Sequence, residues 1–485
     1  MSEWKKVKIG DICKIVKGTT GIASAEPGEY PLVVTAEERK TCSTYQFDCE
    51  AVCIPLVSSS GHGKKSLKNV HYQSGKFALG TILCAVIPNN PQELDARYLH
   101  QYLQFYKDII LVPLMKGAAN VSLSMKDILA VEFPLPPIER QRELSNLFVS
   151  LQEKQKELSA EYEKQTEYAK LLRQNILQQA IEGKLTADWR KQNPVQKGNP
   201  DYDAEALFEQ IQKGEVSPSL QPASQFSATP SPRGKAPKTP KNSREFFEEK
   251  LDSERKRTNN ARSKSLAPIT DEEKPFEIPE GWKWVRLGEI CEYIHRGKSP
   301  KYGNDEILPI IAQKCNQWDK IYTNKCLFAE KSSIEKYLPE QYLQLGDVII
   351  NSTGGGTVGR TGFIKEYVFS NYKQFVADSH VTVVRGNKLL KKELLYYYLI
   401  SPYIQIGLEE RCNGSTNQLE LATSTVNEYM FPLPPLEEQE EIVTKVETLF
   451  AKVTTLENQI QARKSLSDKL IFGIIKENLE ENNGI

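Results

Sequence analysis

The sequence has no excess of charge of either sign, because 63 basic residues balance 63 acidic ones among 485. No apolar run approaches the roughly 20 residues that a membrane-spanning helix needs, and none follows Met1 as in a secretion signal. The nine scattered cysteines form no CxxC pair, and no second pair accompanies Cys49 and Cys53 at zinc-ligand spacing. These absences argue against a secreted, membrane-embedded or zinc-binding protein. We expect a reduced, cytoplasmic protein with no membrane partner, and bulk charge gives no support for nucleic-acid binding.

Motifs for catalysis are also lacking. Residues 354–361 nearly spell the phosphate-binding GxxxxGK[ST], but Arg360 replaces the lysine, and residues 362–365 and 367–369 read as strand where a helix should begin. Two Pro-Pro elements lack the preceding Asn or Asp that a DNA methyltransferase would need. Five scattered histidines support no Ser/His/Asp arrangement. We therefore predict no catalytic residue and no metal site in this chain.

What the sequence does contain is an internal repeat. Residues 4–13 and 282–291 are identical at six of ten positions, and FPLPPIERQ at 133–141 recurs as FPLPPLEEQ at 431–439. A Gly-x-x-Asn pattern precedes each FPLPP element. Three matches in the same order indicate a duplicated chain.

A long helical segment follows each FPLPP element. Apolar residues recur there at alternating steps of four and three, the heptad spacing of coiled coils. The predicted seam residues are Leu144, Phe148, Leu151, Leu158, Tyr162, Leu172 and Ile176 in the first segment, and Ile442, Val446, Leu449, Val453, Leu456, Ile460, Leu470 and Ile474 in the second. Such narrow apolar stripes are unstable alone, so we expect the two helices to pair as a rod of roughly 55–60 Å. A coiled coil that only oligomerises the chain is the alternative.

The remaining sequence divides into two globular parts and a linker. Strand-like runs at 51–57, 80–87, 347–351 and 380–385, with helical runs at 96–106 and 391–400, predict a mixed α+β domain in each half. Residues 215–242 are rich in Pro, Ser and Lys and read as disordered linker, flanked by short helices at 203–213 and 243–264. The predicted boundaries are 1–137 and 276–434 for the domains, 138–185 and 435–481 for the helices, and 186–275 for the linker.

Three loops have a composition suited to contact with DNA. Residues 57–65 (VSSSGHGKK) follow a strand and combine hydrogen-bond donors with glycines that permit close backbone approach. Residues 296–298 and 351–360 have the same chemistry in the second half. Each loop taken alone could equally be a solvent-exposed turn.

The chain closely resembles the specificity subunits of type I restriction–modification systems. The resemblance rests on the paired W-x-x-V-x-L/I-G-E/D-I starts, both FPLPP-x-E-x-Q elements, and PEGWKW at 279–284. LRQNIL at 172–177 with GKL at 183–185, the 57–65 loop, and Gly346-Asp347 add to it. It spans nearly the whole chain, although residues 469–474 depart from the closing motif of the first helix.

The resemblance implies two target-recognition domains joined by a long antiparallel two-helix coiled coil with pseudo-two-fold symmetry. Each domain would read part of a split target in double-stranded DNA, and the coil would set the gap. Two methyltransferase subunits and further restriction/translocase subunits are the implied partners in a bacterial or archaeal cytoplasm. S-adenosylmethionine, ATP and Mg would be bound by those partners, and no cofactor by this chain.

On this interpretation the loops become candidate DNA-binding sites. The candidate side chains are Ser58, Ser59, Ser60, His62, Lys64, Lys65, Lys116, Asn120, Arg296, Lys298, Asn351, Ser352, Thr353, Thr357, Arg360, Asn413 and Asn417. Lys116, Asn120, Asn413 and Asn417 rank second, because Gly-x-x-Asn could simply shape a turn. Two other classes of function stay open at this point: a coiled-coil scaffold whose lobes bind protein, and a fused methylase or nuclease.

Overall fold

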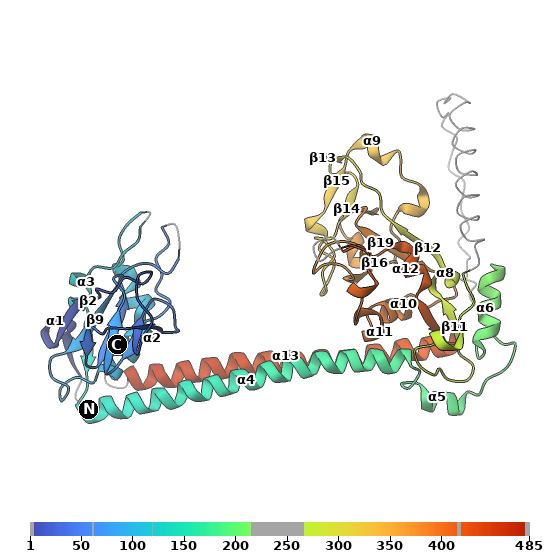
Figure 1. The fold of residues 1–485 in the computed structure, drawn as a ribbon. Helices are drawn as coiled ribbons and strands as arrows, with labels where there is room; N and C mark the ends of the chain where they lie inside the picture. The colour runs from blue at the N-terminus through green and yellow to red at the C-terminus, as the bar shows by residue number, and fades with distance from the viewer. Residues whose placement is uncertain (1–3, 61–62, 119, 215–265, 415–418, 481–485) are drawn as a thin grey trace, which may run out of the picture. The chain divides into compact units, whose positions relative to one another are not determined.

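The computed structural model describes residues 4–60, 63–118, 120–214, 266–414 and 419–480 (Figure 1). The chain forms two compact units, Met1–Thr166 with Asn458–Ile485, and Glu167–Glu457. Each unit has its own hydrophobic core and mixes helices with sheets, which confirms the α+β prediction. The candidates His62 and Asn417, and the predicted linker and helix within 215–265, lie outside the described residues.

The first unit contains three small sheets. One is a four-stranded sheet in the order β2-β9-β6-β7, a second has the order β4-β3-β8-β5, and β1 pairs with β10. The strands are β1 (Lys5–Lys8), β2 (Cys13–Lys17), β3 (Tyr30–Val33), β4 (Lys40–Cys42), β5 (Phe47–Asp48), β6 (Ala51–Pro55), β7 (His71–Gln73), β8 (Lys76–Leu79), β9 (Leu83–Pro88) and β10 (Glu132–Leu135). The helices are α1 (Ile9–Ile12), α2 (Ala96–Ile110), α3 (Met125–Leu129) and the first part of α4 (Ile138–Ile181), with the last part of α13 (Leu436–Glu480).

The second unit repeats this plan with longer connections. Its sheets have the orders β12-β19-β16-β17 and β13-β15-β14-β18, with β11 paired to β20. The strands are β11 (Lys283–Arg286), β12 (Cys291–Arg296), β13 (Tyr302–Gly303), β14 (Pro309–Ile311), β15 (Leu327–Ala329), β16 (Val348–Asn351), β17 (Thr361–Phe363), β18 (Val376–Ala377), β19 (Val381–Gly386) and β20 (Met430–Leu433). The helices are α5 (Ala187–Gln192), α6 (Ala204–Lys213), α8 (Leu287–Ile290), α9 (Lys331–Ile334), α10 (Lys392–Leu399), α11 (Pro402–Gln405) and α12 (Thr423–Glu428).

The repeated sequence elements explain the shared plan. In the first unit Val7 pairs with Phe133 across β1 and β10, and in the second Val285 pairs with Phe431 across β11 and β20. Both Phe side chains are 1% exposed. Each W-x-x-V start therefore closes onto the FPLPP element of its own half, which brings the two ends of a domain to the start of a long helix.

The two long helices run antiparallel wherever they meet. Within the first unit, Arg140 of α4 donates to Asn478 of α13 at 3.3 Å, and Tyr162 bonds to Ser467 at 2.8 Å. Within the second unit, Arg173 pairs with Glu457 and Lys445 donates to the carbonyl of Leu185 at 3.3 Å. In both sets of contacts, residues further along α4 contact residues closer to the start of α13, which is the antiparallel arrangement drawn in Figure 1.

The predicted seam residues are buried in the first turns of both long helices and are less buried further along. Leu144, Phe148, Ile442, Val446 and Val453 are at most 2% exposed. Leu151, Leu158, Tyr162, Leu449, Ile460 and Ile474 are half-buried, and Ile176 is buried.

At three positions the predicted seam residue is exposed instead of buried. Leu172 is 44% exposed, Leu456 48% and Leu470 62%, whereas Ile471 is buried and Arg173 lies half-buried against α13. Successive steps of four lead from 165 through 169 to 173 in α4 and from 449 through 453 to 457 in α13, where the heptad expects a step of three to 172 and to 456. Such a step restores the 3.6-residue period of a straight helix.

Two local predictions need correction or extension. Residues 367–369, expected as strand, form the 3₁₀ helix η6 (Glu366–Phe369). Of the strand expected at 362–365, only the first two residues lie in β17 (Thr361–Phe363). The short helix predicted at 203–213 forms, capped by Asp203 on the amide of Glu205 at 3.1 Å. It is not a free linker segment, because Leu207 and Ile211 pack into the core of the second unit.

None of the helices in the described part of the chain has the length and apolar composition of a membrane span.

Candidate nucleic-acid interface

In the first unit, the loop after β6 is shaped by its own serines. Ser58 Oγ donates to the carbonyl of Lys64 at 2.5 Å, and Ser60 Oγ bonds to Ser66 Oγ at 2.7 Å. Ser59 Oγ accepts from the amide of Lys68 at 2.9 Å. These bonds tie residues 58–60 to residues 64–68, on either side of residues 61–62, and use the serine hydroxyls within the protein. The serines thus position the loop, while the side chains of Lys64 and Lys65 are exposed.

A hairpin carrying the Gly-x-x-Asn pattern lies against this loop. Lys116 and Ser122 bridge to each other, and Ser122 also bridges to Val57. The amide of Ser58 donates to the carbonyl of Val121 at 3.0 Å. The structure therefore joins two sets of candidates that the sequence treated separately.

The second unit has the same arrangement. Asn413 bridges to Glu420, which also bridges to Thr353, and the amide of Gly354 donates to the carbonyl of Leu419 at 3.0 Å. The amide of Leu421 donates to the carbonyl of Ser352, and the amide of Leu123 donates to the carbonyl of Leu56 in the same way. One loop and one hairpin are thus held together by equivalent backbone bonds in each unit.

Several predicted DNA-binding cations are already paired within the protein. Lys116 forms an ion pair with Asp127 at 3.1 Å, and Arg296 pairs with Glu420 at 2.6 Å while donating to the carbonyl of Leu421 at 2.8 Å. Lys298 donates to the carbonyl of Lys336 at 3.0 Å. In the described part of the chain, Lys64 and Lys65 have no such partner and stay available to an anion. Asn120 and Asn413 are exposed at their hairpins.

Gly297 shows that a glycine in a candidate loop can serve the fold instead of a ligand. A Cβ there would lie 1.9 Å from the carbonyl oxygen of Ala377. Gly18 meets the carbonyl of Gly80 in the same way in the first unit, at 2.2 Å. The close approach predicted for residues 296–298 is therefore an approach to the protein's own backbone.

Two candidate DNA-binding residues of the second unit are buried and cannot contact DNA. Asn351 and Ser352 are fully buried. Asn351 Oδ1 accepts from Asn316 Nδ2 at 3.0 Å, and Ser352 Oγ bonds to Thr382 Oγ1 at 2.5 Å. Sequence spacing placed them in a loop, but Asn351 is the last residue of β16 and Ser352 directly follows it, and both are buried beneath the loop.

The glycine-rich turn that follows does not cradle a phosphate at a helix. Gly354, Gly356 and Gly359 have φ of 90°, 74° and 82°, a backbone that only glycine adopts without strain, and strand β17 follows directly. Thr357 donates to the carbonyl of Thr353 at 3.0 Å, and Arg360 donates to Gln317 at 2.6 Å. Thr353 and both of these side chains remain partly exposed along the turn.

Sequence reasoning missed two polar residues beside Thr353. Gln313 Nε2 donates to Thr353 Oγ1 at 2.8 Å, and His380 Nδ1 lies 2.9 Å from the same oxygen. Gln313 follows β14 and His380 precedes β19, so only strand pairing brings them together. No local pattern in the sequence could have found this grouping.

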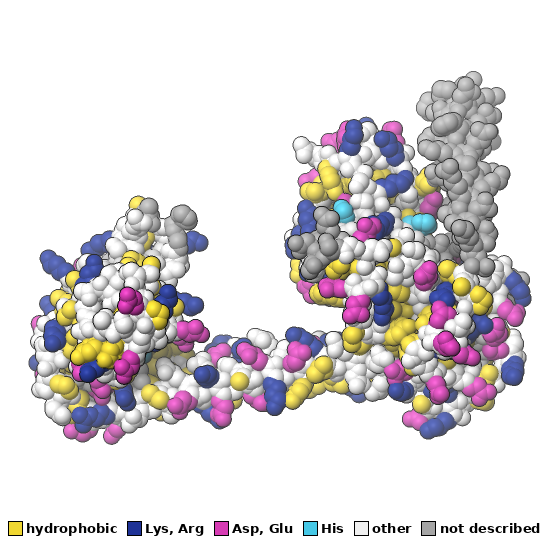
Figure 2. Space-filling model, viewed as in Figure 1, with side chains coloured by type: hydrophobic (Ala, Val, Ile, Leu, Met, Phe, Trp, Pro, Cys, Tyr) yellow, Lys and Arg dark blue, Asp and Glu magenta, His cyan; other side chains and the backbone are white. Residues whose placement is uncertain are grey.

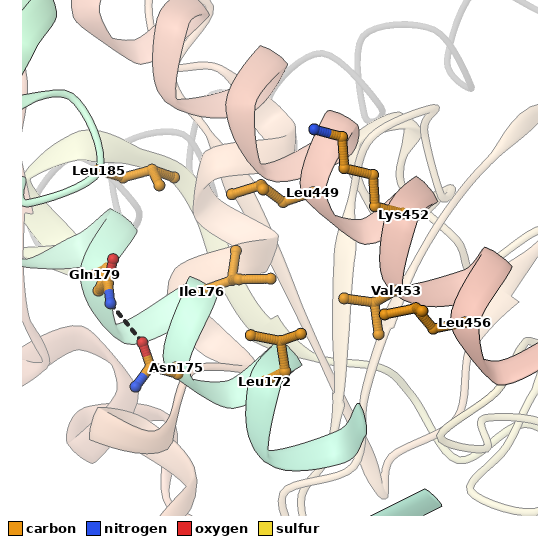
Figure 3. Close-up of a pocket in the computed structure, with 9 residues that line it drawn as sticks. All are labelled: Leu172, Asn175, Ile176, Gln179, Leu185, Leu449, Lys452, Val453 and Leu456. Atoms are coloured by element: carbon orange, nitrogen blue, oxygen red, sulfur yellow. Dashed lines mark hydrogen bonds between the residues drawn. The ribbon is translucent and has the colours of Figure 1, made fainter. Parts of the chain in front are cut away.

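The surface shows mixed charge and one apolar groove between the long helices of the second unit. In the view of Figure 2, basic and acidic side chains are interspersed over each unit, in line with their equal numbers. A groove of about 320 Å³ lies between α4 and α13 in the second unit. Figure 3 shows its apolar lining, with Leu172, Ile176 and Leu185 facing Leu449, Val453 and Leu456. The groove is open to solvent, because Leu172 and Leu456 are nearly half exposed. Its lining is mainly apolar, so it offers few polar groups to a small ligand.

Comparisons with known proteins identify the family. The type I restriction modification DNA specificity domain matches residues 1–167 and 279–463. The type I restriction enzyme EcoDI specificity subunit of Escherichia coli is 21% identical over 469 residues, covering 94% of this chain and 84% of that protein. The EcoAI specificity subunit of E. coli is 28% identical over 229 residues, or 42% of this chain, and the alignment spans about a third (34%) of that relative.

A solved structure supports the fold. A chain from a study of complex assembly and conformational transition of the type I R-M system superimposes with a TM-score of 0.57 at 16% identity, covering 98% of this chain and 97% of that one. The family match spans more than half of the chain and both of its halves, and the relatives are named as specificity subunits. The chain therefore belongs to the type I restriction–modification DNA specificity family, as a non-catalytic specificity subunit.

Proposed function

We propose that this chain reads a bipartite target in double-stranded DNA, with one recognition domain for each half of the target. The observation that carries this proposal is the loop-and-hairpin arrangement that recurs in both units, held by the same backbone bonds around Ser122 and Glu420. Two equivalent surfaces in one chain suit two separate half-sites. Exposed Lys64 and Lys65 would contact phosphate, while partly exposed Thr353 and Arg360 would face the second half-site.

The long helices act in this proposal as an antiparallel coiled coil that fixes the gap between the half-sites, with approximate two-fold symmetry between the domains. Support comes from the antiparallel contacts in each unit and from the step of four in each seam, which ends at 173 in α4 and at 457 in α13, two residues that pair with each other. A helix pair resists bending better than an irregular linker, so it suits a fixed gap.

The helices also offer a surface for partners. We propose that methyltransferase subunits bind there and bring S-adenosylmethionine for adenine methylation, and that restriction/translocase subunits with ATP and Mg join them in the cytoplasm. The open apolar groove with Leu172 and Leu456 supports a protein contact on the helix pair. This chain would select the DNA sequence and hold the target adenine within reach of its partners.

Co-expression with the methyltransferase subunit of the same system, followed by genome-wide mapping of methylated adenines, tests the proposal. A split motif with a constant gap is the expected result. Inserting one heptad at equivalent positions of α4 and α13 should lengthen the gap and leave both half-motifs unchanged, because the domains themselves are untouched. Methylation without a split motif, or none at all, would contradict the function proposed here.

A further inference from the structure

Three side chains from separate parts of the second unit meet at the glycine-rich turn. Gln313 follows β14, Thr353 follows β16, and His380 precedes β19. Thr353 Oγ1 lies 2.8 Å from Gln313 Nε2 and 2.9 Å from His380 Nδ1. His380 is exposed, and Gln313 and Thr353 are partly exposed, so the group lies at the surface.

The directions of these hydrogen bonds follow from their partners. Gln313 also bonds to the backbone carbonyl of Thr353, which can only accept, so the amide nitrogen of Gln313 must face Thr353. That nitrogen donates to Thr353 Oγ1 as well, which leaves the hydroxyl hydrogen free to be donated to His380 Nδ1. The ring proton of neutral His380 then sits on Nε2.

This chain of bonds leaves two groups unused. Within the residues that the structure describes, Gln313 Oε1 and His380 Nε2 have no hydrogen-bond partner. The first is an acceptor and the second a donor. Adenine offers the matching pair in the major groove, a donor at its N6 amino group and an acceptor at N7.

The backbone holds this group firmly. The amide of Ser352 donates to the carbonyl of His380 at 2.8 Å, and the amide of His380 donates to Asp378 Oδ1 at 2.9 Å. Thr353 is bridged on its other side to Glu420. Side chains locked in this way contact a ligand with little loss of conformational entropy.

The first unit has different residues at the equivalent places. The amide of Leu56 donates to the carbonyl of Ile82, as the amide of Ser352 donates to that of His380, so Ile82 is equivalent to His380. Val57 and Thr353 are the next residues after Leu56 and Ser352 and are equivalent too. Leu32 pairs in parallel with Ala78, and Ile310 pairs in the same way with Val376, so Leu32 and Ile310 are equivalent. Thr35 and Gln313 each follow three residues later and are therefore equivalent as well. The first unit therefore has the apolar Val57 and Ile82 beside Thr35, where the second has three polar side chains joined by hydrogen bonds.

We propose that Gln313, Thr353 and His380 form a base-reading cluster that selects an adenine in one half of the DNA target. Thr353 orients the other two side chains, which contact the base edge. The inference rests on the proposed function and adds the residues and the chemistry of one half-site. It also predicts that the two half-sites are read by different chemistry, since the first unit has no equivalent polar cluster among its described residues.

Methylation mapping of the complex with its methyltransferase subunit tests the cluster. His380→Ala, Gln313→Ala and Thr353→Val should each relax one adenine position in one half-motif, with a roughly 10-fold loss of preference. Thr353→Ser keeps the hydroxyl and should keep the motif. Gln344→Ala, at an exposed glutamine of the same domain, is the matched control and should change nothing.

The unaltered half-motif serves as an internal measure of folding, together with the melting temperature of each variant. Retention of the full wild-type motif by the three cluster variants would overturn the inference, and so would relaxation of both halves or of a base other than adenine. A split motif from the wild-type complex with these negative results would leave the proposed function intact. Absence of methylation by the wild-type complex would refute both.

Discussion

Gln141 and Gln439, 298 residues apart, make the same hydrogen bonds at the start of the two long helices. Gln141 Oε1 accepts from the amide of Asp95 and Gln439 Oε1 from that of Lys391, both at 2.9 Å. Asp95 and Lys391 are the N-cap residues of α2 and α10. The final glutamine of each FPLPP-x-E-x-Q element thus ties the start of a long helix to the start of a domain helix.

Replacing either glutamine by alanine should destabilise its own unit. Both side chains are fully buried, and each also donates to a proline carbonyl, Pro136 at 2.8 Å and Pro434 at 3.0 Å. The substitution leaves buried backbone groups unpaired, which costs roughly 1–3 kcal/mol. Urea unfolding of Gln141→Ala and Gln439→Ala measures this change. Gln152→Ala, at an exposed position of α4, should have almost no effect, and equal effects of all three would contradict the prediction.

The seam shift can be tested at two adjacent residues. Ile471 is 7% exposed and Leu470 62% exposed. Ile471→Ala should lower the free energy of unfolding by about 2–4 kcal/mol because it leaves a cavity between the helices. Leu470→Ala should change it by less than about 0.5 kcal/mol. Denaturant titration of the two variants decides between the registers, because a strict heptad predicts the opposite order.

The ion pair between Arg173 and Glu457 should contribute modestly to helix pairing. Arg173 donates to both carboxylate oxygens, at 3.1 and 2.8 Å, and its guanidinium lies 4.9 Å from the centre of the Phe450 ring. The hydrogen bonds from Arg173 lower the pKa of Glu457. Both side chains remain partly exposed, so a double-mutant cycle should give a coupling of about 0.5–1 kcal/mol that falls with added salt. The exposed pair Glu167–Lys170 on α4 is the control and should give less. A salt-independent coupling would exclude an electrostatic origin.

Lys64 and Lys65 should contribute to DNA affinity without contributing to sequence preference. Lys64→Ala plus Lys65→Ala should weaken binding to duplex DNA and reduce the slope of log K against log salt by about 1 for each phosphate that the loop no longer neutralises. Lys5→Ala plus Lys6→Ala removes the same charge from exposed positions of β1 and serves as the control. Fluorescence titrations at several salt concentrations measure the slope. An unchanged slope in the first variant would remove this loop from the interface.

His71 should make the stability of the first unit depend on pH. Burial, together with the nearby positive charge of Arg39, lowers the pKa of His71 from 6.5 to about 4. Arg39 NH1 lies 3.2 Å from His71 Nδ1. Between these pH values the unfolded chain binds a proton that the folded unit does not, so stability is full above pH 6.5 and falls as the pH drops towards 4.

From pH 7 to pH 5 this single group should cost about 2 kcal/mol. Urea unfolding of the wild type and of His71→Asn at the two pH values measures the difference. The variant should lose less stability than the wild type on acidification. The same decrease in both proteins would show that His71 does not carry the effect.

Local spacing was enough to predict much of the fold. The repeat, the strands at β6, β9, β16 and β19, and the apolar positions of the long helices all depend on neighbours within a few residues. The heptad failed at Leu172, Leu456 and Leu470 because a rigid 3.5-residue period ignores the drift of a real helix against its partner. The steps of four that end at 173 in α4 and at 457 in α13 depend on how the two helices pack against each other, which local sequence spacing does not specify.

The candidate interface was predicted less well, for a different reason. Composition and spacing were enough to predict that donor-rich, glycine-containing loops follow β6 and β16, one in each half. Which of their side chains serve the fold depends on contacts made in the folded protein. The fold pairs Arg296 with Glu420 and buries Asn351, while it leaves Lys64 exposed and brings Gln313 and His380 to Thr353. A hydrogen bond depends on positions in space, and residues far apart in the chain become neighbours only when the strands that carry them pair.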